Sequence, residues 1–340
     1  MTIAVCILAK NEADCIGVLL KRLAEQSLLR QGGSTVDVHV VANGCTDDTA
    51  RIAAGFQEKL GQLGVGLKTY DIHPGGKSRA WNRMVHELAG PGDIETFVFC
   101  DADIDFVDEH VLREMVEALR SEPTLKVVVG YPLKNVVNKE RKSLVDRFSL
   151  AVSSQTRHQN AITGQLYAIK AEEARRIWLP DETPGEDGFL NAMVNTDGFT
   201  QVRPGPLVRE HGRPTHYYDD LKPGDFVRHE RRLIVGTVIN RWIFEYLWSL
   251  DLSSPAGPLI RDLNNSEPDW VERIVRERAT GQRWLIPNAI VFARMKTRAG
   301  EAIWKRAAFL PLAAAATLIT VPPAIAANRL LKRTGAAKVW

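Results

Sequence analysis

The run Asp101-Ala102-Asp103 is the stretch of this sequence best suited to chemistry. It follows five apolar or β-branched residues, 96–100, which predict a buried strand of a parallel sheet. In an open α/β sheet, ligands bind beyond the carboxyl ends of the strands. Carboxylates gathered there repel one another unless a cation holds them, and Mg²⁺ or Mn²⁺ carrying a phosphorylated substrate suits that role. The alternative is a solvated turn that caps the helix expected over residues 107–120.

Strands and helices that alternate along the chain must position this acidic run. We expect strands at 3–9, 36–42, 65–72, 96–100 and 126–130, and helices at 14–26, 77–88 and 107–120. This alternation predicts βαβ units, and hence a mainly parallel sheet with helices on both faces. The polar stretches all follow strands, so they meet at one edge of the sheet. A dehydrogenase or P-loop enzyme is disfavoured, because the sequence has no GxGxxG motif after the first strand and no GxxxxGK(S/T) motif.

Five motifs occur in order along the chain: Ala9-Lys10-Asn11-Glu12, Asn43-Gly44-Cys45-Thr46-Asp47-Asp48-Thr49, Gly76-Lys77-Ser78-Arg79-Ala80-Trp81-Asn82, Asp101-Ala102-Asp103 and Gly185-Glu186-Asp187. Together they resemble a family-2 glycosyltransferase over about residues 1–235. The resemblance implies the GT-A fold, a Rossmann-like, mainly parallel central sheet flanked by helices. It also implies a UDP- or GDP-sugar donor. We expect this domain at 1–232, with a donor part to about 130 and an acceptor part at 131–232.

The resemblance also assigns the metal and donor sites. Asp103 is expected to bind Mg²⁺ or Mn²⁺, with Asp101 on sugar hydroxyls or on the metal through water, and His211 as a further metal ligand. Asn43 stands where many relatives have an aspartate that binds the nucleotide base. Because an amide both donates and accepts hydrogen bonds, Asn43 is still expected to bind the base. Glu12 is expected near the ribose or base, or alternatively as an acid favoured by a helix dipole. The remaining donor-binding candidates are Ala9, Asn11, Ala102 and, on the diphosphate, Lys77.

In inverting relatives, the aspartate of the Glu-Asp pair is the general base, so we assign Asp187 as the base and Glu186 as its neighbour. Two acids that merely favour a helix N-terminus are the alternative. Gly164 and Gln165 resemble the segment that lines the acceptor side. Arg228, Arg231 and Arg232 resemble a basic motif that binds the diphosphate, or are the solvated end of an amphipathic helix.

The C-terminal region, 233–340, is expected to be helical and rich in tryptophan. From residue 270 onward the chain carries 13 Lys and Arg against 3 Asp and Glu, which suits an anionic membrane surface. Residues 307–327 are uncharged, and a continuous helix of that length would be roughly as long as a bilayer core is thick. Because Pro311, Pro322 and Pro323 interrupt the segment, we expect an interfacial or re-entrant helix pair. A soluble helical cap and a single spanning helix remain as alternatives.

The leading functional hypothesis is an inverting glycosyltransferase at the cytoplasmic face of the membrane, peripheral or re-entrant, acting on a lipid-linked or polysaccharide acceptor. A retaining transferase and a non-catalytic partner protein of the same fold are the alternatives. Nucleic-acid binding is not expected, because the basic tail accompanies an apolar segment rather than base-stacking aromatics. No signal peptide is expected, since the chain enters a strand at once. The four cysteines lie at no metal-ligand spacing.

Overall fold

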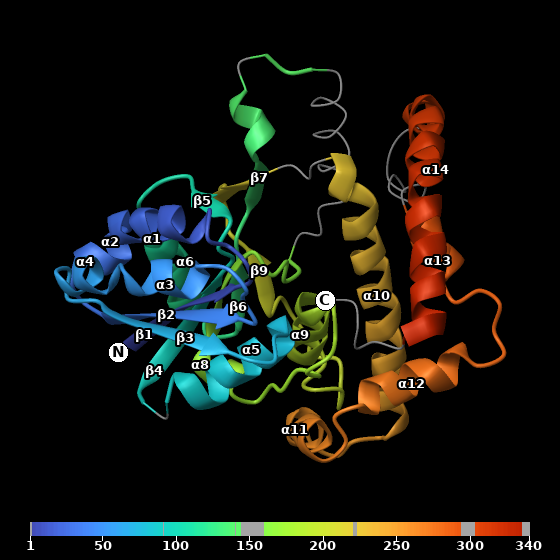
Figure 1. Cartoon of the computed structure of the whole chain (residues 1–340), viewed down its shortest axis with the longest axis horizontal. Helices are drawn as coiled ribbons and strands as arrows, with labels where there is room; N and C mark the ends of the chain where they lie inside the picture. The colour runs from blue at the N-terminus through green and yellow to red at the C-terminus, as the bar shows by residue number, and fades with distance from the viewer. Residues whose placement is uncertain are drawn as a thin grey trace.

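A computed structural model describes residues 2–90, 92–139, 141–143, 160–219, 223–293 and 303–334, without the side chains of residues 303–316. Within this part of the chain, seven strands form one sheet in the order β3-β2-β1-β4-β8-β6-β9, and three form a smaller sheet, β5-β10-β7. Helices flank the larger sheet, and α10, α12 and α14 stand together beside it (Figure 1). The α/β architecture expected from the sequence is therefore confirmed.

The strands of the larger sheet are β1 (Thr2–Ala9), β2 (Thr35–Asn43), β3 (Gly66–Ile72), β4 (Ile94–Cys100), β6 (Val127–Val129), β8 (Leu166–Lys170) and β9 (Val208–Glu210). Those of the smaller sheet are β5 (Ile104–Phe106), β7 (Pro132–Lys134) and β10 (His216–Tyr218).

The helices of the first 200 residues are α1 (Ile16–Glu25), α2 (Ser27–Arg30), α3 (Thr49–Ala54), α4 (Gln57–Gly61), α5 (Lys77–Arg83), α6 (Val111–Ser121), α8 (Ala171–Ala174) and α9 (Glu186–Asn195). A π-helical turn, Met84–Leu88, continues α5, and short 3₁₀ turns cover Asn135–Asn138 and Pro223–Asp225. The C-terminal helices are α10 (Phe226–Ser249), α11 (Gly257–Ser266), α12 (Trp270–Ala279), α13 (Asn288–Val291) and α14 (Ile303–Thr334).

Alternation along the strands creates a core on each face of the sheet. In β1, Ile3 and Val5 join the core beneath α1 and α6, whereas Ala4 and Cys6 join the core beneath α5, α9 and α10. Both faces are apolar because successive side chains of a strand point to opposite sides, and here both sides are covered by helices. The core beneath α5, α9 and α10 continues into the C-terminal helices as far as Leu331.

The expected mainly parallel sheet is confirmed with one antiparallel strand, and two helix boundaries need correction. The strand after β4 in the sheet is β8, which runs antiparallel to both β4 and β6, so the sheet is mixed on this side. The helix expected at 107–120 begins at Val111, because β5 and a turn precede it. The helix expected at 14–26 begins at Ile16, after a turn in which the Glu12 carbonyl accepts from the Cys15 and Ile16 N–H groups.

The C-terminal region also differs from expectation. The proposed boundary at residue 232 falls inside α10, which runs unbroken from Phe226 to Ser249. The expected helix pair at 307–327 is one continuous helix, α14, despite its prolines. An interior proline costs about 3 kcal/mol, and α14 continues past Pro322 and Pro323 with Ala324, Ala327 and Leu331 buried against the core. No helix of the described residues is both long and apolar enough to cross a bilayer.

Candidate active site

Hydrogen bonds join the loops that follow β1 and β2 at the carboxyl edge of the sheet. Asn11, with a φ of 55°, accepts a hydrogen bond at Oδ1 from the Thr46 N–H at 2.8 Å. The Glu12 N–H donates to Thr49 Oγ1, also at 2.8 Å. Ala9, the last residue of β1, is fully buried and pairs with β2. Ala9 and Asn11 therefore build the edge on which the neighbouring acids stand.

Asn43 ends β2 and is buried, with its Oδ1 accepting from the Gly76 N–H at 2.7 Å. The loop before α5 lies so close to this strand end that a Cβ on Gly44 would stand 2.8 Å from the Gly75 Cα. Gly44 also has a φ of +63°, which favours glycine. Asn43 thus fixes the loop that leads to Lys77.

Lys77, at the start of α5, links the two acidic motifs. Its Nζ lies 2.8 Å from Asp101 Oδ1 and 3.1 Å from Glu186 Oε1. Burial would lower the pKa of Lys77, but the two carboxylates raise it above its ordinary value. Burial raises the pKa of Asp101 to about 6, although Lys77 acts against that rise. The sequence placed Lys77 on the diphosphate and gave no sign that it joins Asp101 to Glu186.

Glu12 and Asp103 add further negative charge at this edge. Burial, with Asp103 and Asp101 nearby, raises the pKa of Glu12 to about 7. Asp103 is exposed, and Ala102 between the two aspartates is buried. Among the residues described, no three His, Cys, Asp or Glu side chains form a ready metal cage. A pair of carboxylates still fits Mg²⁺ or Mn²⁺, because such ions keep waters and bind substrate phosphates as remaining ligands.

Glu186 and Asp187 open α9, and they face Gly164 across the site. Gly164 has a φ of +77°, and a Cβ there would lie 3.4 Å from the Asp187 Cβ. Burial raises the pKa of Asp187, Glu186 raises it further, and Lys77 and Arg232 oppose this rise. The Gly188 N–H donates to Asp187 Oδ1 at 2.7 Å. Asp187 is thus a half-buried carboxylate whose proton affinity is increased by its surroundings.

Lys77, Asp101, Gly164, Glu186 and Asp187 share one pocket, whereas Glu12, Asn43 and Asp103 are not among its lining residues. It is lined by Leu8, Lys77, Trp81, Phe99, Cys100, Asp101, Gly164, Tyr167, Leu179, Glu186, Asp187 and Leu190. Gln165 joins the two sides, because its carbonyl accepts from the Asp101 N–H at 2.8 Å and its side-chain Oε1 lies 3.3 Å from His216 Nε2. The structure therefore brings the predicted acceptor segment, the first aspartate and the predicted base together.

The three arginines at the start of α10 have different surroundings. Arg228 is exposed and pairs with Asp225 at 2.9 Å. Arg231 has a buried Nε that lacks a hydrogen-bond partner among the described residues. Arg232 is near enough to Asp187 to lower the pKa of that carboxyl. Of the three, Arg232 is the one the structure associates with the predicted base.

His211, expected as a further metal ligand, makes its contacts with the loop after β9 and with α6. Its Nδ1 lies 3.1 Å from the Arg213 carbonyl oxygen, and its Nε2 lies 3.6 Å from Glu114 Oε2 on α6. Arg213 joins the same group through an ion pair with Asp108 at 2.6 Å. These contacts tie the loop after β9 to α6.

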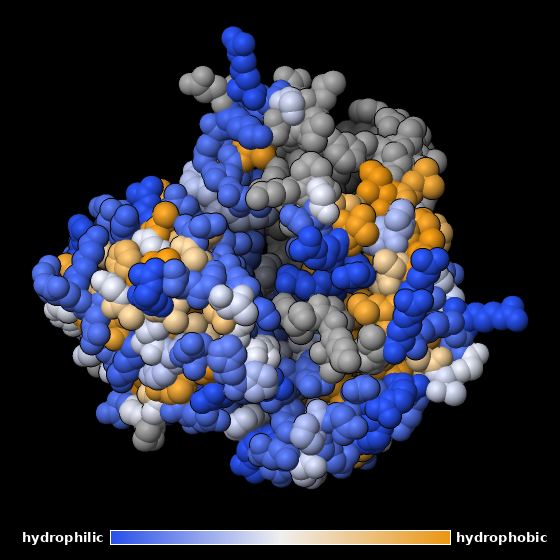
Figure 2. Space-filling model, viewed as in Figure 1, coloured by the Kyte–Doolittle hydropathy of each residue, from blue (hydrophilic) through white to orange (hydrophobic). Residues whose placement is uncertain are grey.

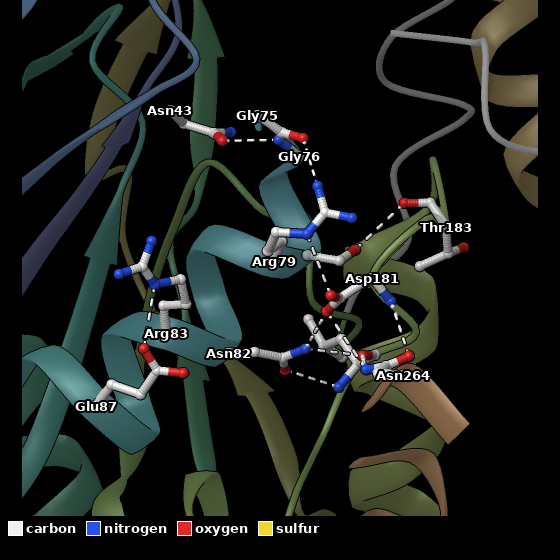
Figure 3. Close-up of polar contacts among 12 residues, drawn as sticks. Asn43, Gly75, Gly76, Arg79, Asn82, Arg83, Glu87, Asp181, Thr183 and Asn264 are labelled. Carbon is white, nitrogen blue, oxygen red and sulfur yellow. Dashed lines mark hydrogen bonds and ion pairs between the residues drawn. The ribbon is translucent and has the colours of Figure 1, made fainter. Parts of the chain in front are cut away.

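A polar network missed by the sequence reasoning holds the segment before α9 (Figure 3). Arg79 Nε lies 3.2 Å from Asp181 Oδ2, and the Asn82 amide donates to Asp181 Oδ1 at 2.9 Å and to the Leu179 carbonyl at 2.8 Å. From α11, the Asn264 amide also donates to the Leu179 carbonyl, at 2.9 Å. The only sequence signal was the cluster of polar residues in the first turns of α5.

The mainly parallel sheet, with acidic side chains at its carboxyl edge, Lys77 at the start of α5 and the Glu186-Asp187 pair at the start of α9, has the arrangement of a GT-A-type α/β enzyme. The chain matches the family model described as glycosyl transferase family 2 over residues 4–186, more than half of its length, and it belongs to that family of glycosyltransferases. No curated protein matches its sequence.

Solved structures with a similar fold include the mannosyltransferase PcManGT from Pyrobaculum calidifontis, in complex with GDP-Man and Mn²⁺. It is 17% identical, with a TM-score of 0.54 over 96% of this chain and 86% of that chain. S. aureus TarS 1–349 with UDP is 14% identical, with a TM-score of 0.45 over 98% and 91%. Glucosyl-3-phosphoglycerate synthase from Mycobacterium tuberculosis, with Mn²⁺, UDP and glucosyl-3-phosphoglycerate, is 19% identical, with a TM-score of 0.46 over 70% and 79%.

Proposed function

We propose that this glycosyltransferase moves one sugar from a UDP- or GDP-sugar to a lipid-linked or saccharide acceptor, with inversion at the anomeric carbon. The observation that carries the proposal is the placement of Asp187. Asp187 lines the same pocket as Asp101 and Lys77, lies beside the backbone of Gly164, and has a raised pKa. A carboxylate in that position is available to an acceptor hydroxyl that enters the pocket beside Gly164.

In the proposed step, the acceptor oxygen forms a bond to the anomeric carbon as the bond from that carbon to the diphosphate oxygen breaks. The bonding electrons leave with the diphosphate, and Asp187 takes the hydroxyl proton. The raised pKa makes Asp187 a stronger base than an ordinary aspartate, which favours proton transfer near neutral pH. Glu186 stays paired with Lys77, so the two adjacent acids have separate roles.

We assign Mg²⁺ or Mn²⁺ to Asp103, with Asp101 beside it. When bound, the ion supplies Lewis-acid stabilisation of the diphosphate charge. The fit rests on the two carboxylates; burial, together with the charges of Asp103 and Asp101, also raises the pKa of the nearby Glu12. The presence of GDP-Man and Mn²⁺ in PcManGT supports a metal-bound sugar nucleotide here.

The test is a panel of UDP- and GDP-sugars with Mn²⁺, scored for release of nucleoside diphosphate and for the anomeric configuration of the product. Asp187→Asn keeps the oxygen that accepts from Gly188 and should lower turnover by about 10²–10⁴-fold without changing the affinity for nucleoside diphosphate. Asp251→Asn, at an exposed residue after α10, is the matched control. Normal turnover in Asp187→Asn, or retention of configuration, would contradict the base assignment.

We further propose that α14 rests on the cytoplasmic face of a membrane. Its buried face carries Ala324 and Ala327, whereas Leu318 is 71% exposed and Ile325 is 39% exposed. The same outer face continues with the exposed basic residues Arg329, Lys332 and Arg333. Figure 2 shows hydrophobic residues gathered over α10 and α14, at the right of the view. An apolar stripe followed by basic residues suits an anionic lipid surface.

Vesicle flotation tests this placement. The protein should float with anionic vesicles more than with neutral ones, since each nearby basic residue contributes about 1 kcal/mol, and high salt should weaken the binding. Leu318→Ser with Ile325→Ser should reduce flotation, whereas Val202→Ser, which removes an equally exposed apolar residue elsewhere, should not. Equal flotation of the two variants would show that α14 is not the lipid-binding surface.

A further inference from the structure

Asn240 is a buried amide in the middle of α10, with only 6% of its surface exposed. Both ends of the amide are used. Its Oδ1 accepts a hydrogen bond from Thr183 Oγ1 at 2.8 Å, and its Nδ2 donates to the Gly185 carbonyl oxygen at 2.7 Å. Both bonds go to the short segment that immediately precedes Glu186 and Asp187. A buried polar group is costly unless its partners are present, so this amide is well matched to that segment.

The backbone on both sides is shaped for this approach. A Cβ on Gly185 would lie 2.8 Å from Asn240 Nδ2, and a Cβ on Gly236 would lie 3.2 Å from the Pro184 carbonyl oxygen. Neither position has room for a larger residue without a shift of α10 or of the segment. The helix therefore lies directly against the turn that leads into α9.

The same segment is held from the donor side. Ser78 Oγ donates to the Thr183 carbonyl at 3.2 Å, and Ser78 follows Lys77, whose Nζ contacts Glu186. The turn before the predicted base is thus fixed between α5 on one side and α10 on the other. Of the hydrogen bonds that Ser78 and Asn240 make to residues 183–185, the bond from Asn240 to the Gly185 carbonyl is the nearest in sequence to Asp187.

We infer that Asn240 is a positioning residue for the general base. By holding the Gly185 carbonyl, it sets the direction in which α9 begins and so the position of the Asp187 carboxylate relative to Gly164 and the acceptor. The inference rests on the proposed function. It makes α10, in the C-terminal region, a part of the catalytic apparatus. Displacement of a catalytic group by about 1 Å costs on the order of 10²-fold in rate.

The experiment must separate positioning from stability. Replacement of both members of a buried hydrogen-bonded pair by apolar residues of similar shape is often nearly neutral for stability. The double variant Thr183→Val with Asn240→Leu removes the amide and the hydroxyl together, and the Gly185 carbonyl keeps its helical bond from the Phe189 N–H. Thr237→Val is the matched control, because it removes a side-chain hydrogen bond elsewhere on α10.

We expect the double variant to lose about 10- to 100-fold in kcat, with KM for the sugar nucleotide and the calorimetric affinity for nucleoside diphosphate within two-fold of the parent. Its unfolding midpoint in urea should stay close to that of Thr237→Val. Thr183→Val alone, which keeps the Gly185 bond, should lose less kcat than the double variant. If the double variant does not fold, Asn240→Leu alone undergoes the same measurements.

A folded variant with unchanged kcat would overturn the positioning role. So would a loss of kcat matched by an equal loss of nucleotide affinity, because that would indicate general damage to the site. Failure of the parent enzyme to transfer sugar would instead contradict the proposed function, so the two failures are distinguishable.

Discussion

Lys77→Met should destabilise the protein in a pH-dependent manner. In the parent, the Lys77 ammonium lies 2.8 Å from one Asp101 oxygen and 3.1 Å from one Glu186 oxygen. At an effective dielectric constant of about 20, two unit charges 3 Å apart attract by about 5 kcal/mol before their desolvation is counted. The side chains are 23%, 25% and 15% exposed, so the cluster is neither a surface pair nor fully enclosed.

Removal of one partner from a buried pair costs about 3–5 kcal/mol, and the partial exposure places Lys77→Met near the lower end, at about 3 kcal/mol. The loss should be larger at pH 8 than at pH 5. The pKa of Asp101 is already raised to about 6, so at pH 5 this carboxyl is largely protonated and needs no cation. At pH 8 the Asp101 carboxyl is charged, and the methionine leaves it beside Glu186 without a cation.

Urea denaturation followed by circular dichroism at the two pH values measures the effect. Arg83→Met is the matched control on the same helix, since its ion pair with Glu87 is exposed and worth about 0.5 kcal/mol. If Lys77→Met were no more destabilising than Arg83→Met, or equally destabilising at pH 5 and pH 8, the view of Lys77 as the cation that joins the two motifs would be refuted.

Three further results are expected. Asp103→Ala should abolish the Mn²⁺-dependent part of nucleoside diphosphate binding in calorimetry, and unchanged metal dependence would exclude Asp103 as a ligand. Glu12→Gln should be more stable than the parent at pH 8 but not at pH 5, by on the order of 1 kcal/mol in the free energy of unfolding after discounting for solvent screening. The reason is that the pKa of Glu12 is raised to about 7, so its ionisation destabilises the folded parent as the pH rises. Parallel pH profiles of the two proteins in urea denaturation would contradict this. Gly164→Ala should lower the free energy of unfolding by about 1 kcal/mol, because the φ of Gly164 is +77°. It should also lower the rate of sugar transfer, because the added methyl group would touch Asp187. Normal product formation would show that the site tolerates a side chain there.

Much of the donor side follows from local sequence rules. Apolar runs that end in polar residues predicted β1, β2, β3 and β4, and parallel strands bring those endings to one edge. Asp101 and Glu12 could therefore be placed near each other from the sequence. The antiparallel β8 was not predicted, because it enters the sheet from far along the chain and its pairing depends on tertiary contacts.

Pairings between distant residues were the main omission. Lys77 and Glu186 are more than 100 positions apart, and nothing local distinguishes a lysine that binds carboxylates from one that binds a diphosphate. The prolines of α14 were read as helix breakers, whereas α14 runs unbroken from Ile303 to Thr334 and packs against α10. Asn240 did carry a signal, as an amide amid the apolar residues of α10, and a search for polar residues on apolar helix faces would have found it.

The position of the C-terminal helices changes what truncation experiments mean. The donor-site candidates precede residue 233, which suggests that the tail is separable from catalysis. However, α14 packs against α10, and α10 holds the Gly185 carbonyl through Asn240. Deletion of α14 would expose apolar residues of α10 that belong to the core beneath α5, α9 and α10. Loss of activity on truncation would therefore not distinguish membrane release from displacement of the base, whereas substitutions on the outer face, such as Leu318→Ser, would.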